Sequence, residues 1–266
     1  MLKTVHRVEF ISSNVHGMPD CFVSIAGPGA PTMVAIHGIS RNAAEIATRF
    51  SQHPAFAGTN IIAPLFDGAR FGKYQQLRTL KEGQTPSDQG LFLLLDHLAG
   101  QKAIDTAKVS IFGFSGGAQM AHRLAMLHPS RISALCATAA GWYLLPTDNL
   151  PYPYGLGQGC LPGWNRDATL RIPMTIIVGN RDTRIDDSVR QDPIIVAHQG
   201  TNRLRRARIW VQRMRQEAAK GTYNESISLI TLENGSHDFG QCVREAGLLD
   251  FVSDALRAPH DCSSCD

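Results

Sequence analysis

The sequence predicts an α/β fold with a mostly parallel central sheet of about eight strands and helices on both faces. Short apolar runs alternate with longer segments of helical periodicity, which is the pattern of βαβ units. The runs are apolar throughout, as in strands covered on both faces of a sheet. With 266 residues, 43% of them hydrophobic, the chain can bury the core of one domain, so we expect a single domain over residues 1–266.

The elements follow in chain order. The first 30 residues, which include HRVEFISSN and CFVSIAG, predict an antiparallel hairpin added at one edge of the sheet. Further strands are expected at 32–39, 60–66, 109–114, 132–140, 173–180 and 226–233. Helices are expected near 88–103, at 116–128, near 202–220 and near 241–257.

Residues 141–168 break this alternation, because they are rich in proline, glycine and aromatic residues and show little periodicity. Long segments of this kind usually act as lids or binding loops, although a surface excursion that packs on itself is the alternative. The segment follows the end of a strand, at the sheet edge where ligands bind in such folds. We therefore expect a lid or substrate loop here, with Trp142 and Tyr143 binding substrate.

Charge and hydropathy exclude several classes of function. The 26 basic and 23 acidic side chains leave a net charge of +3, which is too small to indicate nucleic acid as the main partner. The helix at 203–220 is rich in arginine, but apolar residues recur in it at helical spacing, so the arginines are expected on a solvated face. No apolar run is long enough for a membrane span, and the N-terminus lacks the pattern of a signal peptide. We expect a cytoplasmic protein, or a periplasmic or secreted one if a signal peptide has been removed.

The six cysteines are spread without the spacing of a disulfide framework, and Cys136 in the run ISALCATAA is expected to be a buried thiol. The tail pair Cys262 and Cys265 forms one CxxC motif, which lacks the second ligand pair of a zinc site. We expect no metal, and either a frayed tail or a disulfide to Cys242.

The segment Gly113-Phe-Ser-Gly-Gly117 fits the motif G-x-S-x-G, with a strand before it and a helix after it. Its glycines remove side chains that would clash in a tight turn, and the helix directs free N–H groups and its positive end at Ser115. The glycine spacing fits neither a phosphate-binding loop nor GxGxxG. Ser115 is therefore predicted to be a nucleophile, with a plain helix-entry turn capped by serine as the alternative.

A nucleophilic serine needs a histidine to take its proton and a carboxylate to orient that histidine. In this arrangement the acid and then the histidine follow the serine, at the ends of later strands. Asp182 follows the strand at 173–180, and His237 follows the last strand. Asp186 and Asp187 remain alternatives for the acid. The other histidines considered, which fit the pattern less well, are His122, His128, His198 and His260.

The oxyanion of an acyl-transfer reaction needs two hydrogen-bond donors. One is expected to be the backbone N–H of Gly116, directly after the nucleophile. The other should come from the loop after the strand at 32–39, where the Ile39 N–H is the first choice. The alternative for His37-Gly38 is an ordinary turn that ends a strand.

Several segments in this order resemble the α/β-hydrolase superfamily over about residues 30–258. The segments VAIHGISRNA, FGFSGGAQMAHRLA, AGWYLLPT, IPMTIIVGNRD and Gly-Ser-His-Asp are similar to its polyhydroxybutyrate depolymerase-like branch, which includes feruloyl-esterase-like enzymes. The resemblance implies an α/β-hydrolase fold and a serine esterase with Ser115, Asp182 and His237 in the triad positions. It also implies that no cofactor is needed.

We expect hydrolysis of short-chain or small aryl esters, with hydroxyalkanoate oligomers among the candidate substrates. The segment at 141–168 offers no amphipathic helix that could bind a lipid surface, which argues against long-chain lipids. A peptidase, thioesterase or acyltransferase with the same three residues is the alternative, followed by a catalytically silent binding protein on the same fold. The sequence gives no indication of the oligomeric state.

Overall fold

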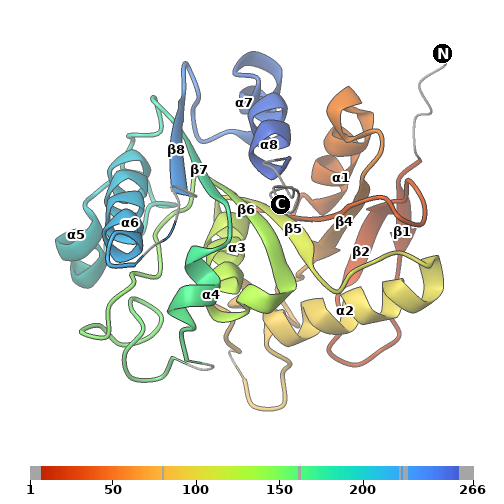
Figure 1. The fold of residues 1–266 in the computed structure, drawn as a ribbon, viewed down its shortest axis with the longest axis horizontal. Helices are drawn as coiled ribbons and strands as arrows, with labels where there is room; N and C mark the ends of the chain where they lie inside the picture. Colours follow the sequence, from red (N-terminus) through yellow and green to blue (C-terminus); the bar gives the residue numbers. More distant parts are fainter. Residues whose placement is uncertain (1–6, 80, 161–162, 222, 224–226, 258–266) are drawn as a thin grey trace, which may run out of the picture.

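The computed structural model of the protein describes residues 7–79, 81–160, 163–221, 223 and 227–257. Its centre is an eight-stranded sheet with the order β1-β2-β4-β3-β5-β6-β7-β8 (Figure 1). The strands are β1 (Glu9–Ile11), β2 (Asp20–Ser24), β3 (Thr32–Ile36), β4 (Asn60–Leu65), β5 (Val109–Phe114), β6 (Ile132–Thr138), β7 (Met174–Gly179) and β8 (Ile227–Leu232). All neighbours from β4 to β8 are parallel, while β1 and β2 form the antiparallel edge. The predicted fold class and edge hairpin are confirmed.

Helices cover both faces of this sheet. They are α1 (Ala43–Gln52), α2 (Ser87–Lys102), α3 (Gly116–Leu127), α4 (Arg166–Leu170), α5 (Pro193–Gln199), α6 (Arg203–Ala218), α7 (Phe239–Glu245) and α8 (Leu248–Leu256), with short 3-10 turns at Pro54–Phe56, Tyr74–Gln76 and Pro129–Arg131. Helices α1, α7 and α8 lie on one face of the sheet, and α2, α3 and α6 lie on the other (Figure 1). Most of the buried apolar side chains of the two groups belong to two separate core clusters. Strands β3 and β7 are buried along their whole length, which explains their continuous apolar sequence.

Several features of the helices differ from the expectation, since α4 and α5, like α1, lie in segments where no helix was expected. The segment expected as one helix near 241–257 is divided into α7 and α8, because Gly247 adopts a left-handed conformation with φ of 64° between them. Helix α1 was not expected, although Ile46 and Phe50 recur at helical spacing and are buried. The loop that leaves β3 leads into α1, and Gly38 in this loop lies beside Ser115.

The described part of residues 141–168 is packed against the body of the protein. Arg123 of α3 is fully buried and holds this segment through its Nη2 atom, which donates to the Pro153 carbonyl at 3.3 Å. The same guanidinium lies 4.4 Å from the ring centroid of Trp142. Burial lowers the pKa of Arg123 to about 10, so it still carries a charge at neutral pH. The segment is thus anchored by a buried cation.

The predictions for the C-terminal residues His260, Cys262 and Cys265 concern positions outside the described residues. Cys136 is buried as expected, and burial raises the pKa of its thiol to about 12. Cys242 is also buried. Within the described ranges, no cluster of three or more His, Cys, Asp or Glu residues could hold a metal ion. No helix in that same part of the chain has the length and hydropathy needed to cross a bilayer.

Candidate active site

Ser115 occupies a sharp turn between β5 and α3. Its backbone has φ of 55° and ψ of −112°, a strained conformation for a residue with a side chain. A β-carbon at Gly113 would collide with the Gly117 carbonyl, and one at Gly117 would collide with the Ile36 carbonyl of β3. The role predicted for these two glycines is therefore confirmed, since only glycine allows α3 to begin so close to the sheet. The strain, on the order of 1–3 kcal/mol, exposes the Ser115 hydroxyl at the tip of the turn.

Three predicted residues meet at the carboxyl ends of the parallel strands. The Ser115 Oγ atom lies 3.0 Å from His237 Nε2, and His237 Nδ1 lies 2.9 Å from Asp182 Oδ2. Because Nδ1 faces a carboxylate, the network assigns the ring proton to Nδ1, which leaves Nε2 free to accept the serine proton. The Phe114 ring stacks on the imidazole with centroids 5.4 Å apart. This chain of hydrogen bonds is the arrangement that activates a serine.

The loops that carry Asp182 and His237 are joined through their backbones. Strands β7 and β8 are parallel neighbours, so both loops leave the same edge of the sheet. The Arg181 N–H donates to the Gly235 carbonyl at 3.0 Å, which fixes one loop against the other. A side chain at Gly179 would collide with the backbone of Gly235, so the close approach requires glycine. The separation between the acid and the histidine is thereby set by the sheet.

The alternative acids do not contact His237. Asp186 is exposed and accepts hydrogen bonds from the hydroxyl and N–H of Ser188, which lower the pKa of its carboxyl. Asp187 is also exposed. Asp182, in contrast, is 2% exposed and points at the ring. The geometry therefore selects Asp182 as the partner of His237.

The described alternatives for the base, His122, His128 and His198, do not contact Ser115 or Asp182, whose histidine partner is His237. His122 of α3 is fully buried, and its ring joins the Ala118 carbonyl to the N–H of Leu144. His128 pairs with Asp88 at 2.8 Å. His198 lies in α5 rather than in a loop at the sheet edge.

The loop after β3 presents the Ile39 N–H to the nucleophile. The Gly38 carbonyl accepts hydrogen bonds from the His37 ring, 2.7 Å from Nδ1, and from the Arg41 N–H at 3.0 Å. Gly38 C=O and Ile39 N–H belong to one trans peptide, so the N–H points away from these partners. The Ile39 nitrogen lies close to Gly116, since a β-carbon on that glycine would be 3.4 Å from it. Within the described residues, neither the Ile39 N–H nor the Gly116 N–H is donated to another group, so both can serve a ligand.

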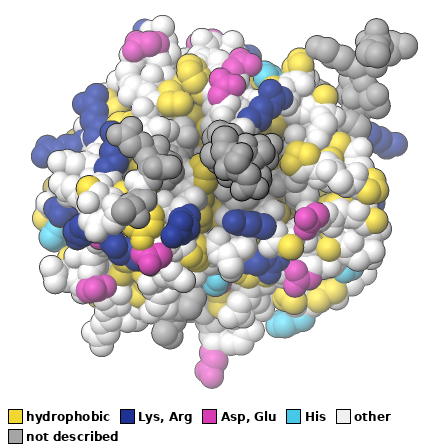
Figure 2. Space-filling model, in the orientation of Figure 1, with side chains coloured by type: hydrophobic (Ala, Val, Ile, Leu, Met, Phe, Trp, Pro, Cys, Tyr) yellow, Lys and Arg dark blue, Asp and Glu magenta, His cyan; other side chains and the backbone are white. Residues whose placement is uncertain are grey.

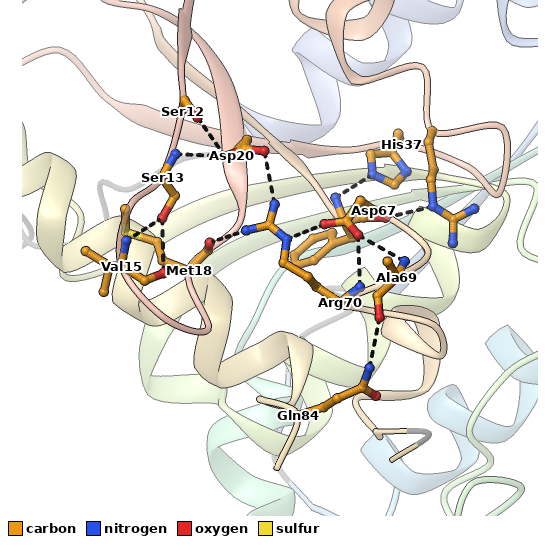
Figure 3. Close-up of polar contacts among 12 residues, drawn as sticks. Ser12, Ser13, Val15, Met18, Asp20, His37, Asp67, Ala69, Arg70 and Gln84 are labelled. Carbon is orange, nitrogen blue, oxygen red and sulfur yellow. Dashed lines mark hydrogen bonds and ion pairs between the residues drawn. The ribbon is translucent and has the colours of Figure 1, made fainter. Parts of the chain in front are cut away.

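His37 holds this loop in place through hydrogen bonds of its ring. The sequence analysis considered it only as part of a turn. Its Nε2 atom accepts the Phe66 N–H at 3.0 Å, so the ring must be neutral with its proton on Nδ1. Burial lowers its pKa to about 4, which preserves this state near neutral pH. Figure 3 shows the His37 ring facing the segment in which Arg70 joins Asp67 to Asp20. The loop after β3 is therefore tied to the segment that follows β4.

Arg203 of α6 is a second partner of the triad carboxylate. Its Nη1 atom lies 3.0 Å from Asp182 Oδ1, and both side chains are 1% exposed. Arg206 is also buried and donates to three backbone carbonyls. The expectation that the arginines of this helix are all solvated is wrong for these two residues, because both reach carbonyl or carboxylate oxygens inside the fold. The exposed basic residues of α6 are Arg205, Arg208, Arg213 and Arg215. Figure 2 shows several dark blue side chains at the left of the view, where Figure 1 places α5 and α6.

A pocket of about 420 Å³ opens beside Ser115, between the start of α1 and the start of α7. It is lined by the loop at 38–45, by Phe114 and Ser115, by Ser188, and by residues 237–240 and Arg244. The described part of residues 141–168 does not line it.

Trp142 and Tyr143, expected to bind substrate, do not line this pocket, and that expectation is corrected here. Tyr143 is fully buried, and its ring stacks on Trp210 with centroids 5.3 Å apart. Trp142 is 3% exposed and lies against Arg123. Both side chains are used by the core, because the strand end that they follow turns inward over α3 and α6.

No protein-family model and no curated protein sequence matches the chain. Among solved structures it is similar to poly(aspartic acid) hydrolase-1 from Sphingomonas sp. KT-1, with a TM-score of 0.76 and 20% identity over 96% of this chain and 99% of that one. It is similar to LpqC, a poly(3-hydroxybutyrate) depolymerase from Bordetella parapertussis, with a TM-score of 0.72 and 25% identity over 90% and 86% of the two chains. A ferulic acid esterase matches with a TM-score of 0.60 and 13% identity over 95% and 98% of the chains. These neighbours, together with the strand order, identify the α/β-hydrolase fold of esterases and depolymerases.

Proposed function

We propose that this α/β-hydrolase-fold protein is a serine esterase that cleaves short-chain or small aryl esters through an acyl-enzyme. The hydrogen-bonded series Ser115, His237 and Asp182, facing the N–H groups of Ile39 and Gly116, carries this proposal. The hydrolases and esterases among its structural neighbours support an enzyme of the hydrolase class. The proposal includes a cytoplasmic enzyme of one domain that needs no cofactor.

The first half of the reaction forms the acyl-enzyme. Ser115 Oγ attacks the ester carbonyl carbon while its proton passes to His237 Nε2. The carbonyl oxygen becomes an oxyanion that accepts hydrogen bonds from the N–H groups of Ile39 and Gly116. Asp182 stabilises the imidazolium through Nδ1–H. As the tetrahedral intermediate collapses, His237 returns the proton to the leaving alcohol.

The second half repeats these steps with water. His237 takes a proton from water, whose oxygen attacks the acyl carbon, and the same two N–H groups hold the second oxyanion. The proton then returns to Ser115 Oγ, and the carboxylic acid leaves. Removing one donor of an oxyanion hole typically costs about 10²–10³ in kcat, so the loop held by His37 also contributes to the rate, although less than the triad.

The size of the pocket supports a small substrate. Its volume of about 420 Å³ lies near the lower end of the usual range for ligand sites, roughly 300–1,000 Å³. Ile39, Phe114 and Phe239 supply apolar walls close to the nucleophile. A short acyl chain or one aryl ring fits these walls, whereas a long lipid chain would extend into solvent.

Arg244 adds a feature that favours substrates with a carboxylate, such as hydroxyalkanoate oligomers. It lines the same pocket, and its guanidinium folds back over Gly240, where a β-carbon would lie 2.9 Å from Nη1. Asp238 and Glu45, the pocket's carboxylates, already accept hydrogen bonds from Gln241 and Asn42 respectively. Across the described part of the chain, the Arg244 side chain has no hydrogen bond or ion pair of its own. It is therefore free to receive a substrate carboxylate.

Labelling and a substrate series test the proposal. A fluorophosphonate should label Ser115 stoichiometrically, and Ser115→Ala should abolish both labelling and ester turnover without loss of the fold. With p-nitrophenyl esters of increasing acyl length, kcat/KM should be highest for short chains and should fall for long ones. A matched anilide and a thioester separate the esterase from the peptidase and thioesterase alternatives. Labelling at another residue would contradict the serine assignment, and a maximum at long chains would contradict the substrate class.

A further inference from the structure

We propose that Arg203 is a positioning residue of the triad, which holds the Asp182 carboxylate against His237 and limits the positive charge that the imidazole accumulates. This inference rests on the proposed serine esterase function and adds to it a residue outside the three triad positions. Arg203 lies on α6, 21 positions after Asp182, and does not line the pocket. It can act on the reaction only through Asp182.

The two oxygens of Asp182 have separate partners. Oδ2 faces His237 Nδ1 at 2.9 Å, and Oδ1 accepts from Arg203 Nη1 at 3.0 Å. Rotation of the carboxylate would break both interactions, so the guanidinium fixes the plane in which Oδ2 meets the ring. The carboxylate and the guanidinium are each 1% exposed, so water cannot replace either partner.

Arg203 is itself held in place by neighbouring residues. Its Nη2 atom donates to Ser188 Oγ at 2.7 Å, which connects the triad to the pocket wall. One turn later, Arg206 Nη1 donates to the Gly141 carbonyl at 2.6 Å and anchors the first turn of α6. The Arg203 Nε atom is buried and has no hydrogen-bond partner among the described residues, which is costly for a donor. Arg203 thus donates hydrogen bonds to Asp182 and Ser188 while its own Nε–H stays without a partner among the described residues.

The charge of Arg203 also acts on the imidazolium that forms at His237 during the proposed reaction. If Asp182 had no other partner, its buried carboxylate would attract a His237 imidazolium with its full negative charge. The positive charge of Arg203, on the far side of the carboxylate, reduces that attraction. The other titratable groups that face this pair are Tyr143, Cys242, Asp186, Asp238, Glu45 and Arg244. Burial raises the pKa of Tyr143 and Cys242, so both are neutral at working pH. Asp186, Asp238 and Arg244 are exposed and screened by solvent, which leaves Arg203 as the buried cation in contact.

The pH profile of kcat/KM distinguishes this role from a purely structural one. For Arg203→Met, the midpoint of the acid limb should move up by about 1 pH unit, because a nearby buried charge is removed at an effective dielectric constant of about 20. Arg203→Lys keeps the charge with a shorter reach, so its acid limb should stay near the wild-type position while kcat falls. Arg208→Met removes one charge from an exposed position of the same helix and should leave both unchanged.

An acid limb that stays in place in Arg203→Met, with activity merely reduced, would overturn the inference. If Arg203→Met does not fold, Arg203→Gln and Arg203→Lys provide the same comparison, because both keep a donor to Asp182 and only lysine keeps the charge. Fluorophosphonate labelling of the wild-type protein separates this outcome from a failure of the proposed function. An unlabelled wild-type Ser115 refutes the serine mechanism, whereas a labelled Ser115 with an unmoved acid limb refutes only the role of Arg203.

Discussion

Acid should destabilise this protein through His37, the histidine that holds the loop after β3 in place. The ring is fully buried, donates from Nδ1 to the Gly38 carbonyl and accepts the Phe66 N–H at Nε2. A proton on Nε2 would face another donor, so folding requires the neutral ring. Burial lowers the pKa of His37 from 6.5 to about 4, whereas the unfolded chain titrates near the ordinary value. Between these two values the unfolded state binds more protons, and the free energy of unfolding falls as the pH falls.

The magnitude follows from this difference. Each pKa unit corresponds to about 1.36 kcal/mol, so the full effect is about 3 kcal/mol once the pH is below both values. At pH 4.5 most of it is expressed, and His37 alone should lower the free energy of unfolding by about 2.5 kcal/mol relative to pH 7.5. This is a large fraction of the roughly 5–15 kcal/mol that stabilises a typical domain.

The comparison with His37→Gln isolates this contribution. The amide of Gln does not titrate, and its oxygen can accept the Phe66 N–H. Urea unfolding of both proteins at pH 7.5 and 4.5, followed by circular dichroism, should give a pH-dependent loss about 2.5 kcal/mol smaller for the variant. Buried His122 has a lowered pKa as well, but it is present in both proteins and cancels. If both proteins lost the same free energy of unfolding between pH 7.5 and 4.5, the assignment of a neutral His37 ring that stabilises the fold would be refuted.

Four further outcomes are expected. Asp182→Asn should lower kcat by about 10³–10⁴, whereas Asp186→Asn should change it little, and the reverse order in steady-state assays would reassign the acid. Trp142→Ala should lower the free energy of unfolding by about 3–5 kcal/mol in urea titrations. If the variant instead kept its stability and changed its preference among the esters, Trp142 would be a substrate-binding residue. Gly116→Ala should lower kcat by about 10²-fold or more, because its methyl group would lie 2.7 Å from the Tyr74 hydroxyl and 3.0 Å from Ile39 Cγ2 and would displace the loop that carries one oxyanion donor. Full activity would argue against that donor pair. Arg244→Ala should raise KM for a hydroxybutyrate dimer with a free carboxylate but not for its methyl ester, and equal effects on the two would exclude a carboxylate contact.

The sheet and the meeting point of the triad could be predicted because they depend on local patterns. Each parallel strand is an apolar run, and the carboxyl ends of such strands share one edge, so Ser115, Asp182 and His237 could be placed near one another by chain position alone. The turn at Ser115 was equally visible, since the strand, the glycines and the helix that form it follow one another in the sequence. Helix α1 carried a usable signal in the spacing of Ile46 and Phe50.

The side-chain partners of the site could not be predicted in the same way. Helical periodicity places charged residues outside, and nothing near Arg203 in the sequence indicates that Asp182 receives it inside the fold. Trp142 follows a strand at the expected edge, but its burial depends on Arg123, which belongs to another element. The role of His37 depends on the Phe66 N–H, which comes from the segment after the neighbouring strand. Such pairings are decided by tertiary packing rather than by local sequence.

The position of the pocket between α1 and α7 has a consequence for how this protein can acquire new substrates. Its walls come from residues 38–45 and 237–244, near opposite ends of the chain, while residues 141–160 serve the core. Libraries for altered selectivity belong in the two wall segments, where exposed side chains such as Ile39 can vary without opening a cavity. Grafting residues 141–160 from another hydrolase would remove the aromatic partner of the Arg123 guanidinium and cost stability before it changed selectivity. The two wall segments are far apart in the sequence, so substrate selectivity can be altered from either of them.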